Sequence, residues 1–174
     1  MSWKDHHTDL PKEIRFLLIT TSDTIVASRA RGVACQDVSG ELAESLVKGA
    51  GYLVAGRLCL ANSVEEIRNE IRNLVSSGSA DVVVVSGGTG PGPHDLTIEA
   101  ISPLIDKPLP GFGELFRRLS YETVGISSIA SRSMAGVSKK ALIFALPGSP
   151  DAVRLALERI ILPESQHLLK MVQG

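Results

Sequence analysis

The 174-residue sequence has few cysteines, few aromatic residues and almost no net charge. Its two cysteines, Cys35 and Cys59, are too few for a disulfide framework, and neither lies in a recognisable catalytic context. A net charge of −1 gives no electrostatic footprint for nucleic acid or acidic membranes. No apolar stretch approaches the roughly 20 residues of a membrane span, and the first residues lack the apolar centre of a signal peptide. We therefore expect a cytoplasmic protein that binds neither nucleic acid nor membrane.

The length and composition predict one globular domain with a substantial core. We expect residues 1–12 to form a polar N-terminal tail, either frayed or packed on another subunit, and residues 13–174 to form the domain. The predicted strands cover residues 14–19, 52–60, 81–85 and 141–146. Helices are predicted from an N-cap at Ser39 to residue 48, from a capping box at Ser63 and Glu66 to a stop at Gly78, over 96–101, from 109 to about 122, and from 151.

Strands that alternate with helices favour a parallel sheet covered by helices on both faces. In such α/β folds, ligands bind beyond the carboxyl ends of the strands. The unusual loops of this chain all fall at that edge, at residues 20–23, 61–63, 86–95 and 147–150. The sequence therefore predicts one binding site built from four loops.

The loop from Ser86 to Asp95 carries the strongest functional signal. It holds four glycines between a β-branched strand and a helix, so that backbone N–H groups can face an anion. The spacing excludes a P-loop, because Pro93 stands where the lysine belongs, and it excludes a dinucleotide fingerprint, because the third glycine would fall at Pro93 or Asp95. Asp95 closes the loop where a metal-bound phosphate can meet it. We interpret the segment as a phosphate-binding loop.

Several short motifs, in order along the chain, carry a resemblance to a known family. They are Ser22-Asp23, Gly87-Gly88-Thr89-Gly90, Asp95-x-Thr97, Pro110-Gly111-Phe112-Gly113-Glu114, Ser131-Arg132 and Leu146-Pro147-Gly148-Ser149. With them, the sequence resembles the MoaB/MogA family of molybdenum cofactor biosynthesis proteins from about Ile14 to the last helix. Arg117, Leu119 and the segment from Ser131 to Val137 are closer to the MoaB branch.

The resemblance implies a three-layer α/β/α fold with a mostly parallel sheet, and a homotrimer or a hexamer. It also implies a reaction with Mg-ATP, in which the terminal phosphate of molybdopterin is adenylylated and pyrophosphate is released. Because the attacking phosphate is already anionic, the site must bring two anions together and hold them in line. Other cofactor-biosynthesis proteins are the expected partners.

The resemblance also implies roles for individual residues. Asp95 is expected to hold Mg²⁺, although it or Thr97 could instead cap the following helix. Ser131 and Arg132 are expected to face the pterin's phosphate or a neighbouring subunit, and Ser149 to cap a helix beside the site. The other expected substrate-binding residues are Thr21, Ser22, Asp23, Gly87, Gly88, Thr89, Gly90, Thr97, Pro147 and Gly148. Asp23 fits a turn equally well, and His94 is expected to face solvent.

Asn62 departs from the family pattern, since active members carry a catalytic aspartate at the position where we place it. An asparagine can coordinate Mg²⁺ through its carbonyl oxygen but adds no charge. The sequence therefore keeps a second hypothesis open, a catalytically weak protein that binds or carries molybdopterin. A third is a CinA-type enzyme acting on nucleotides. If this is a weakened enzyme, Asn62→Asp is expected to raise turnover.

Overall fold

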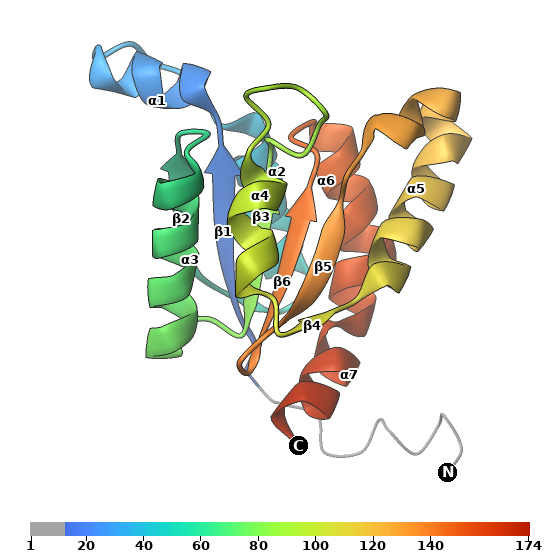
Figure 1. The fold of residues 1–174 in the computed structure, drawn as a ribbon. Helices are drawn as coiled ribbons and strands as arrows, with labels where there is room; N and C mark the ends of the chain where they lie inside the picture. The colour runs from blue at the N-terminus through green and yellow to red at the C-terminus, as the bar shows by residue number, and fades with distance from the viewer. Residues whose placement is uncertain (1–12) are drawn as a thin grey trace.

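The computed structural model describes residues 13–174, which form one six-stranded sheet with helices on both of its faces (Figure 1). The predicted polar tail, residues 1–12, lies outside the described residues. The strands are β1 (Arg15–Thr21), β2 (Leu53–Leu60), β3 (Val82–Ser86), β4 (Lys107–Pro108), β5 (Met134–Ser138) and β6 (Ala141–Leu146). The helices are α1 (Asp23–Ala30), α2 (Val38–Gly49), α3 (Val64–Ser77), α4 (Thr97–Ile101), α5 (Pro110–Val124), α6 (Pro150–Ala156) and α7 (Leu162–Gln173). Three short helical segments connect them, η2 (Ser102–Leu104), η3 (Gly125–Ala130) and the π-helical η4 (Leu157–Ile161).

The strand order is β2-β1-β3-β6-β5-β4. The strands β2, β1, β3 and β6 are parallel, whereas β5 runs antiparallel to β6 and β4 runs antiparallel to β5. Thr20 of β1 pairs in register with Ser86 of β3, which pairs with Leu146 of β6. The carboxyl ends of these three strands therefore reach the same edge, as the sequence predicts for a mostly parallel sheet.

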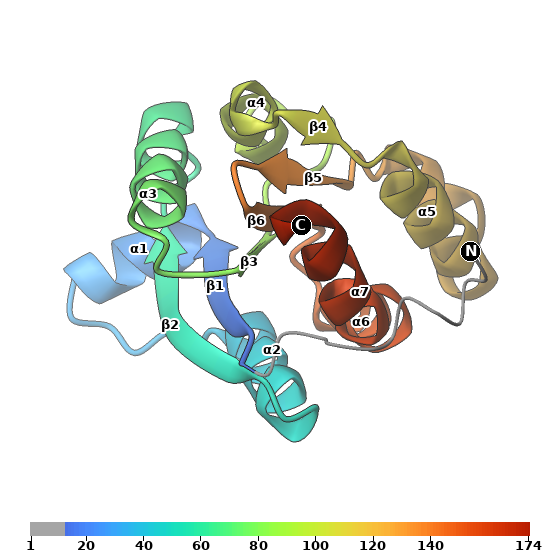
Figure 2. The same ribbon diagram turned by 90° about the horizontal axis from the view of Figure 1, so that it is seen from below.

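Alternate side chains of each central strand enter two separate cores, because successive residues of a strand point to opposite faces. Phe16 and Leu18 of β1 pack in the core formed with α2, α5, α6 and α7, and Leu17 and Ile19 pack against α3 and α4. Viewed along the strands, the sheet lies between these two layers (Figure 2). The predicted three-layer α/β/α arrangement is confirmed.

The antiparallel edge of the sheet is absent from the sequence prediction. The residues of β5 are mostly small, and β4 has only two residues, so neither gives a clear strand pattern. Gly136 lies inside β5, and its close contacts explain why this residue is a glycine. A Cβ at this position would lie 2.4 Å from Ile105 Cγ2 and 2.9 Å from the Lys107 carbonyl oxygen. A neighbouring segment approaches the β5 backbone so closely here that only glycine leaves enough room.

Three of the predicted helix signals are confirmed. Ser63 caps α3 and Ser149 caps α6, each accepting a hydrogen bond from a backbone N–H three residues later. Gly78 ends α3 in the left-handed conformation, at φ +66°. The predicted capping box at Ser63 is only half formed, because the Ser63 N–H donates to the Ala61 carbonyl at 2.8 Å rather than to the Glu66 side chain.

One predicted cap is wrong, and one alternative cap does not form. Asp37, and not Ser39, caps α2, because its buried carboxylate accepts from the Gly40 N–H at 2.9 Å and from the Thr20 hydroxyl at 3.0 Å. Neither Asp95 nor Thr97 caps α4. The cap position is Leu96, and α4 has no side-chain cap bond.

The helix α1 stands at the carboxyl edge of the sheet (Figure 1). Ser22 caps it by accepting from the Ile25 N–H at 3.3 Å. Among residues 13–174, no helix combines the length and the apolar character needed to cross a membrane.

Candidate functional site

Hydrogen bonds tie together the four loops at the carboxyl edge. The Ser22 N–H donates to the Leu60 carbonyl at 2.9 Å, which joins the loops after β1 and β2. The Gly87 N–H donates to the Leu146 carbonyl at 3.0 Å, which joins the loops after β3 and β6. The Ser39 hydroxyl donates to the Gly148 carbonyl at 2.6 Å and fixes the last loop to α2. The structure thus places all four loops at one site.

Two glycines of the loop after β3 occupy positions that no other residue fits. Gly87 and Gly88 have φ angles of +102° and +61°. A Cβ at Gly88 would lie 2.5 Å from Asn62 Oδ1 and 2.6 Å from Thr97 Oγ1. A Cβ at Gly87 would lie 2.4 Å from the Thr21 carbonyl oxygen. The loop backbone therefore packs directly against predicted site residues from three other segments.

Thr97 is fully buried beneath this loop and fixes its first half. Its hydroxyl donates to the Gly87 carbonyl at 2.8 Å, and its backbone N–H donates to the Gly88 carbonyl at 3.0 Å. The Thr97 hydroxyl also lies 3.2 Å from the Thr21 hydroxyl. The two buried threonine side chains, Thr21 and Thr97, thus pack against the buried side of the loop.

Asp23 orients the side chain of Asn62. Asp23 Oδ1 accepts from the Asn62 N–H at 2.8 Å, and Asp23 Oδ2 accepts from Asn62 Nδ2 at 3.4 Å. With its nitrogen held by a carboxylate, the amide must direct Oδ1 toward Gly88 and Thr97. Asn62 Oδ1 is buried and has no hydrogen-bond partner in the protein. We call Gly87 and Gly88, with the Thr21, Asn62 and Thr97 groups packed against them, the glycine cradle. A buried acceptor without a partner in this cradle is the arrangement expected where a ligand supplies the missing donor or cation.

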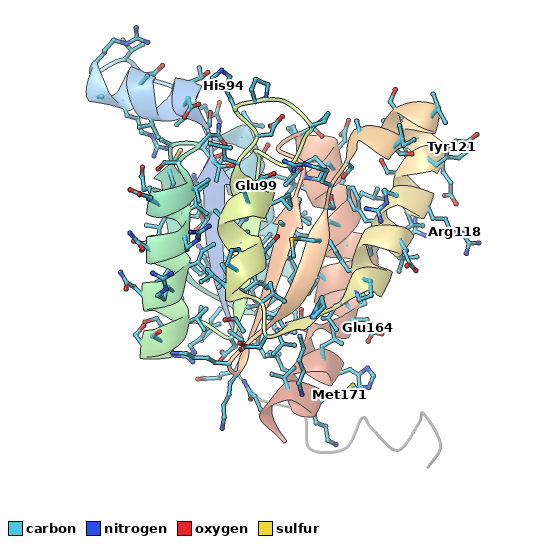
Figure 3. All side chains as sticks on the ribbon, in the orientation of Figure 1. His94, Glu99, Arg118, Tyr121, Glu164 and Met171 are labelled. Carbon is cyan, nitrogen blue, oxygen red and sulfur yellow. The ribbon has the colours of Figure 1, made fainter. Side chains whose placement is uncertain are left out.

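Asp95 bends back over its own loop. Its Oδ2 accepts from the Gly92 N–H at 3.0 Å, and the carboxylate lies so close to Gly90 that a Cβ there would be 2.7 Å from Oδ2. The side chain stays partly accessible, and the neighbouring His94 is exposed at the tip of the loop, as predicted (Figure 3). Asp95 therefore places its carboxylate beside the loop backbone, and this carboxylate does not cap α4.

Eight of the predicted site residues line two cavities, whereas the other seven line neither: Asp23, Asn62, Gly87, Gly88, Asp95, Thr97 and Arg132. A cavity of about 720 Å³ contains Thr89, Gly90, Pro147, Ser149 and Ser131. A second cavity of about 490 Å³ contains Thr21, Ser22 and Gly148. Within the loop after β6, successive residues alternate between the cavities, since Pro147 and Ser149 line the larger one and Gly148 and Pro150 the smaller. This loop is the partition between them.

Most of the residues that wall the two cavities are not among the residues predicted from the sequence. The larger one is walled by hydroxyl-bearing side chains of α5 and η3, and its rim carries charged residues of α6 and η4. A signal existed for the hydroxyls, because Ser120, Thr123 and Ser127 recur at the spacing of one helix face. The smaller cavity adds Gln36, Asp37 and Ser39 from the segment that opens α2.

Ser131 and Arg132 differ in their surroundings. Ser131 lines the larger cavity, and its hydroxyl lies 2.6 Å from that of Ser133. Arg132 forms an ion pair with Glu99 of α4. The hydrogen bond from Arg132 lowers the pKa of the Glu99 carboxyl, and Glu99 raises the pKa of the Arg132 guanidinium. Only Ser131 of this predicted pair therefore faces a cavity.

The described part of the chain has no group of three or more histidine, cysteine, aspartate or glutamate side chains arranged to hold a metal ion. Asp95 and the carbonyl oxygen of Asn62 lie beside the glycines of the loop as a carboxylate and an unpartnered acceptor, two kinds of oxygen that can hold a cation. Such a sparse set suits Mg²⁺ that arrives with phosphate oxygens as its other ligands.

A glycine loop between a buried parallel strand and a helix, flanked by two cavities, is typical of the class of α/β proteins that bind a phosphate-bearing ligand. The comparison with known families makes this class specific. A family profile described as "Probable molybdopterin binding domain" matches residues 17–167. The chain belongs to this family, as the sequence motifs predict.

Individual relatives agree with this assignment over nearly the whole chain. The molybdenum cofactor biosynthesis protein B of Bacillus cereus is 40% identical over 97% of this chain and 96% of its own. A "Probable molybdopterin adenylyltransferase" of Methanocaldococcus jannaschii is 36% identical over 91% and 93%. The crystal structure of the tungsten cofactor synthesizing protein MoaB from Pyrococcus furiosus superposes with a TM-score of 0.81, at 38% identity over 94% and 99% of the two chains.

Proposed function

We propose that this protein acts in molybdenum or tungsten cofactor biosynthesis and adenylylates the terminal phosphate of molybdopterin with Mg-ATP. The observation that carries the proposal is the glycine cradle itself. It lies beside both cavities, and Gly88 packs against Asn62 and Thr97. Two substrates whose reacting groups are both phosphates need this arrangement, with one anion-binding loop between two separate pockets.

In this proposal the nucleoside occupies the smaller cavity and the pterin the larger. Ile25, Val38 and Pro150 give the smaller cavity apolar side chains against which a purine can pack. The larger cavity has hydroxyls of Ser120, Thr123, Ser127 and Ser131, which suit the many nitrogen and oxygen atoms of a pterin. The predicted role of Ser131 beside the pterin's phosphate fits this assignment.

The chemical step has a phosphate group as nucleophile and pyrophosphate as leaving group. The terminal phosphate of molybdopterin attacks the α-phosphorus of ATP, the bond from that phosphorus to the β-phosphate's bridging oxygen breaks, and pyrophosphate leaves with the bond's electrons. Backbone N–H groups of the glycine loop stabilise the negative charge. Asp95 and Asn62 Oδ1 would hold the Mg²⁺ that enters with ATP and screens the repulsion between the two anions.

The direct test incubates the purified protein with molybdopterin, ATP and Mg²⁺, and follows pyrophosphate release and the adenylylated pterin. We expect Asp95→Ala to lower turnover at least about a hundredfold. Asp106→Ala is the matched control, because the Asp106 carboxylate accepts from the Lys139 N–H, away from the cradle. Equal turnover in both variants would contradict the role of Asp95.

The neutral Asn62 keeps a second function in view, a protein that binds molybdopterin without turning it over. It predicts a tight pterin complex, detected by fluorescence quenching or calorimetry, with no pyrophosphate release from the wild type. That outcome would reject the transferase and leave the pterin site in place.

We also propose that the chain forms the homo-oligomer that its sequence resemblance implies. An exposed apolar surface on α5 and η3 supports this, with Ile126 and Ile129 75% and 77% exposed and Tyr121 and Val124 beside them in the sequence. Ile129→Asp should dissociate the oligomer in light scattering. Met171→Asp, at an apolar side chain of α7 that is 67% exposed, is the control and should leave the mass unchanged. A monomeric wild type would reject the proposal.

A further inference from the structure

Arg132 contacts the glycine loop at two places, its middle and its end. Its backbone N–H donates to the Thr89 carbonyl at 3.2 Å, its Nε to the Gly90 carbonyl at 2.9 Å, and its Nη2 to the Asp95 carbonyl at 2.9 Å. One residue, in the segment that leads into β5, thus binds carbonyl groups at the middle and the end of the loop. No other side chain among the described residues has a recorded hydrogen bond to a carbonyl of residues 89–95.

Glu99 holds the guanidinium in place from the helix that follows the loop. Both of its carboxylate oxygens accept from Arg132, Oε1 from Nη1 and Oε2 from Nη2, the second at 3.2 Å. The Glu99 backbone is itself fixed, because Arg68 of α3 donates to the Glu99 carbonyl at 2.9 Å and to the Ala100 carbonyl at 3.2 Å. The chain of contacts therefore runs from α3 through α4 to the loop.

These contacts direct the Arg132 guanidinium toward oxygen atoms of the protein itself. Nε, Nη1 and Nη2 all donate to protein oxygens, and the charge of Arg132 is balanced by Glu99. Carbonyl oxygens repel phosphate, so a loop that binds anions must direct them away from the ligand. Arg132 binds the carbonyls of Thr89 and Gly90, two residues that line the larger cavity.

We propose that Arg132 is a positioning residue, which fixes the anion-binding conformation of the glycine loop, and that Glu99 orients it. The inference rests on the proposed function only in that the loop binds substrate phosphate. A four-glycine segment has much conformational freedom to lose on binding. A loop fixed beforehand binds its ligand without that cost.

Hydrogen exchange of the loop amides, residues 88–95 without Pro91 and Pro93, tests the proposal without any substrate. In Arg132→Lys we expect these amides to exchange about ten to a hundred times faster, because one ammonium cannot span three acceptors. Glu99→Gln, which keeps one acceptor oxygen, should show a smaller increase, and melting temperatures should stay close to that of the wild type.

The matched control is Arg15→Lys at the opposite edge of the sheet, where Arg15 forms a forked pair with Asp81. It should leave exchange of the loop unchanged. Unchanged loop exchange in Arg132→Lys, together with weaker binding of Mg-ATP measured by calorimetry, would show instead that Arg132 contacts phosphate directly, and would overturn the proposal. Because exchange is measured on the unliganded protein, it decides the role of Arg132 even if adenylyl transfer is not found.

Discussion

The two ends of the parallel strands differ in how their polar groups are satisfied. At the amino end, Asp81 accepts three hydrogen bonds from Arg15, from the backbone N–H and Nη2 at 2.9 Å and from Nε at 3.1 Å. The Asp81 N–H in turn donates to the Arg15 carbonyl at 2.9 Å. At this end Arg15 and Asp81 satisfy each other in a closed network, which holds β1 and β3 in register.

At the carboxyl end, the same strands lead into loops whose polar groups are crowded but not all paired. Asn62 Oδ1 is buried without a partner, although an unsatisfied buried acceptor costs about 1–3 kcal/mol. The closed end contributes stability, and the open end retains an unfavourable group that a ligand can satisfy. The difference separates residues that hold the fold from residues to which we assign the proposed function, even though both sets are polar and partly buried.

The largest effect should come from closing the cradle with one methyl group. Gly88→Ala combines a left-handed backbone at φ +61° with contacts of 2.5 Å and 2.6 Å to Asn62 and Thr97. We expect a loss of about 3 kcal/mol in the free energy of unfolding, together with loss of Mg-ATP binding. Urea unfolding and calorimetry measure the two.

Gly78→Ala is the matched control at the closed end. Gly78 has nearly the same backbone, φ +66°, but a Cβ there meets nothing within 4 Å. It should therefore cost only about 1 kcal/mol and leave nucleotide binding intact. Similar losses in the two variants would mean that backbone strain alone, and not the cradle, explains the effect at Gly88.

An intermediate effect is expected from Asn62→Asp, which replaces the amide held by Asp23 with a second carboxylate. Without a cation, the new carboxylate faces Asp23 Oδ2, 3.4 Å from the present Nδ2, so we expect a loss of about 1 kcal/mol that Mg²⁺ restores. If Asn62 limits catalysis, turnover should rise about tenfold.

Asn69→Asp provides the comparison, because Asn69 is exposed on α3 beside Arg72. The new charge there should slightly stabilise the protein and give no response to Mg²⁺. A stability of Asn62→Asp that does not depend on Mg²⁺ would contradict a cation site at the cradle.

The features predicted well from sequence are those whose cause is local. The β-branched residues of β3, the glycines after it and the stop at Gly78 act through their own backbone preferences. The features missed depend on distant partners. Asp37 caps α2 in place of Ser39 because the hydroxyl of Thr20, in the distant strand β1, also donates to the Asp37 carboxylate. The partition between the cavities likewise arises only when β6 packs beside β3, so no short motif reveals two pockets.

The smallest effect concerns the pH dependence of the ion pair between Arg132 and Glu99 at the carboxyl end. Arg132 lowers the pKa of Glu99 below its ordinary value of 4.5, chiefly through their hydrogen bond. A carboxyl with a lowered folded-state pKa stabilises the protein fully above its unfolded-state pKa, and this stability is lost as pH falls through the folded-state pKa. The stability difference between the wild type and Glu99→Gln should therefore be constant from about pH 5 to 8 and shrink below about pH 4.

Because both side chains are partly exposed, that difference should stay below about 1 kcal/mol. The sharper measurement is the NMR titration of the Glu99 carboxyl carbon, whose midpoint should rise in Arg132→Ala toward the value of an unpaired glutamate. Arg15→Ala, at the closed end, should leave that midpoint where it is. A midpoint that is the same in all three proteins would show that Arg132 and Glu99 do not pair in solution, and the brace on the glycine loop would then need another explanation.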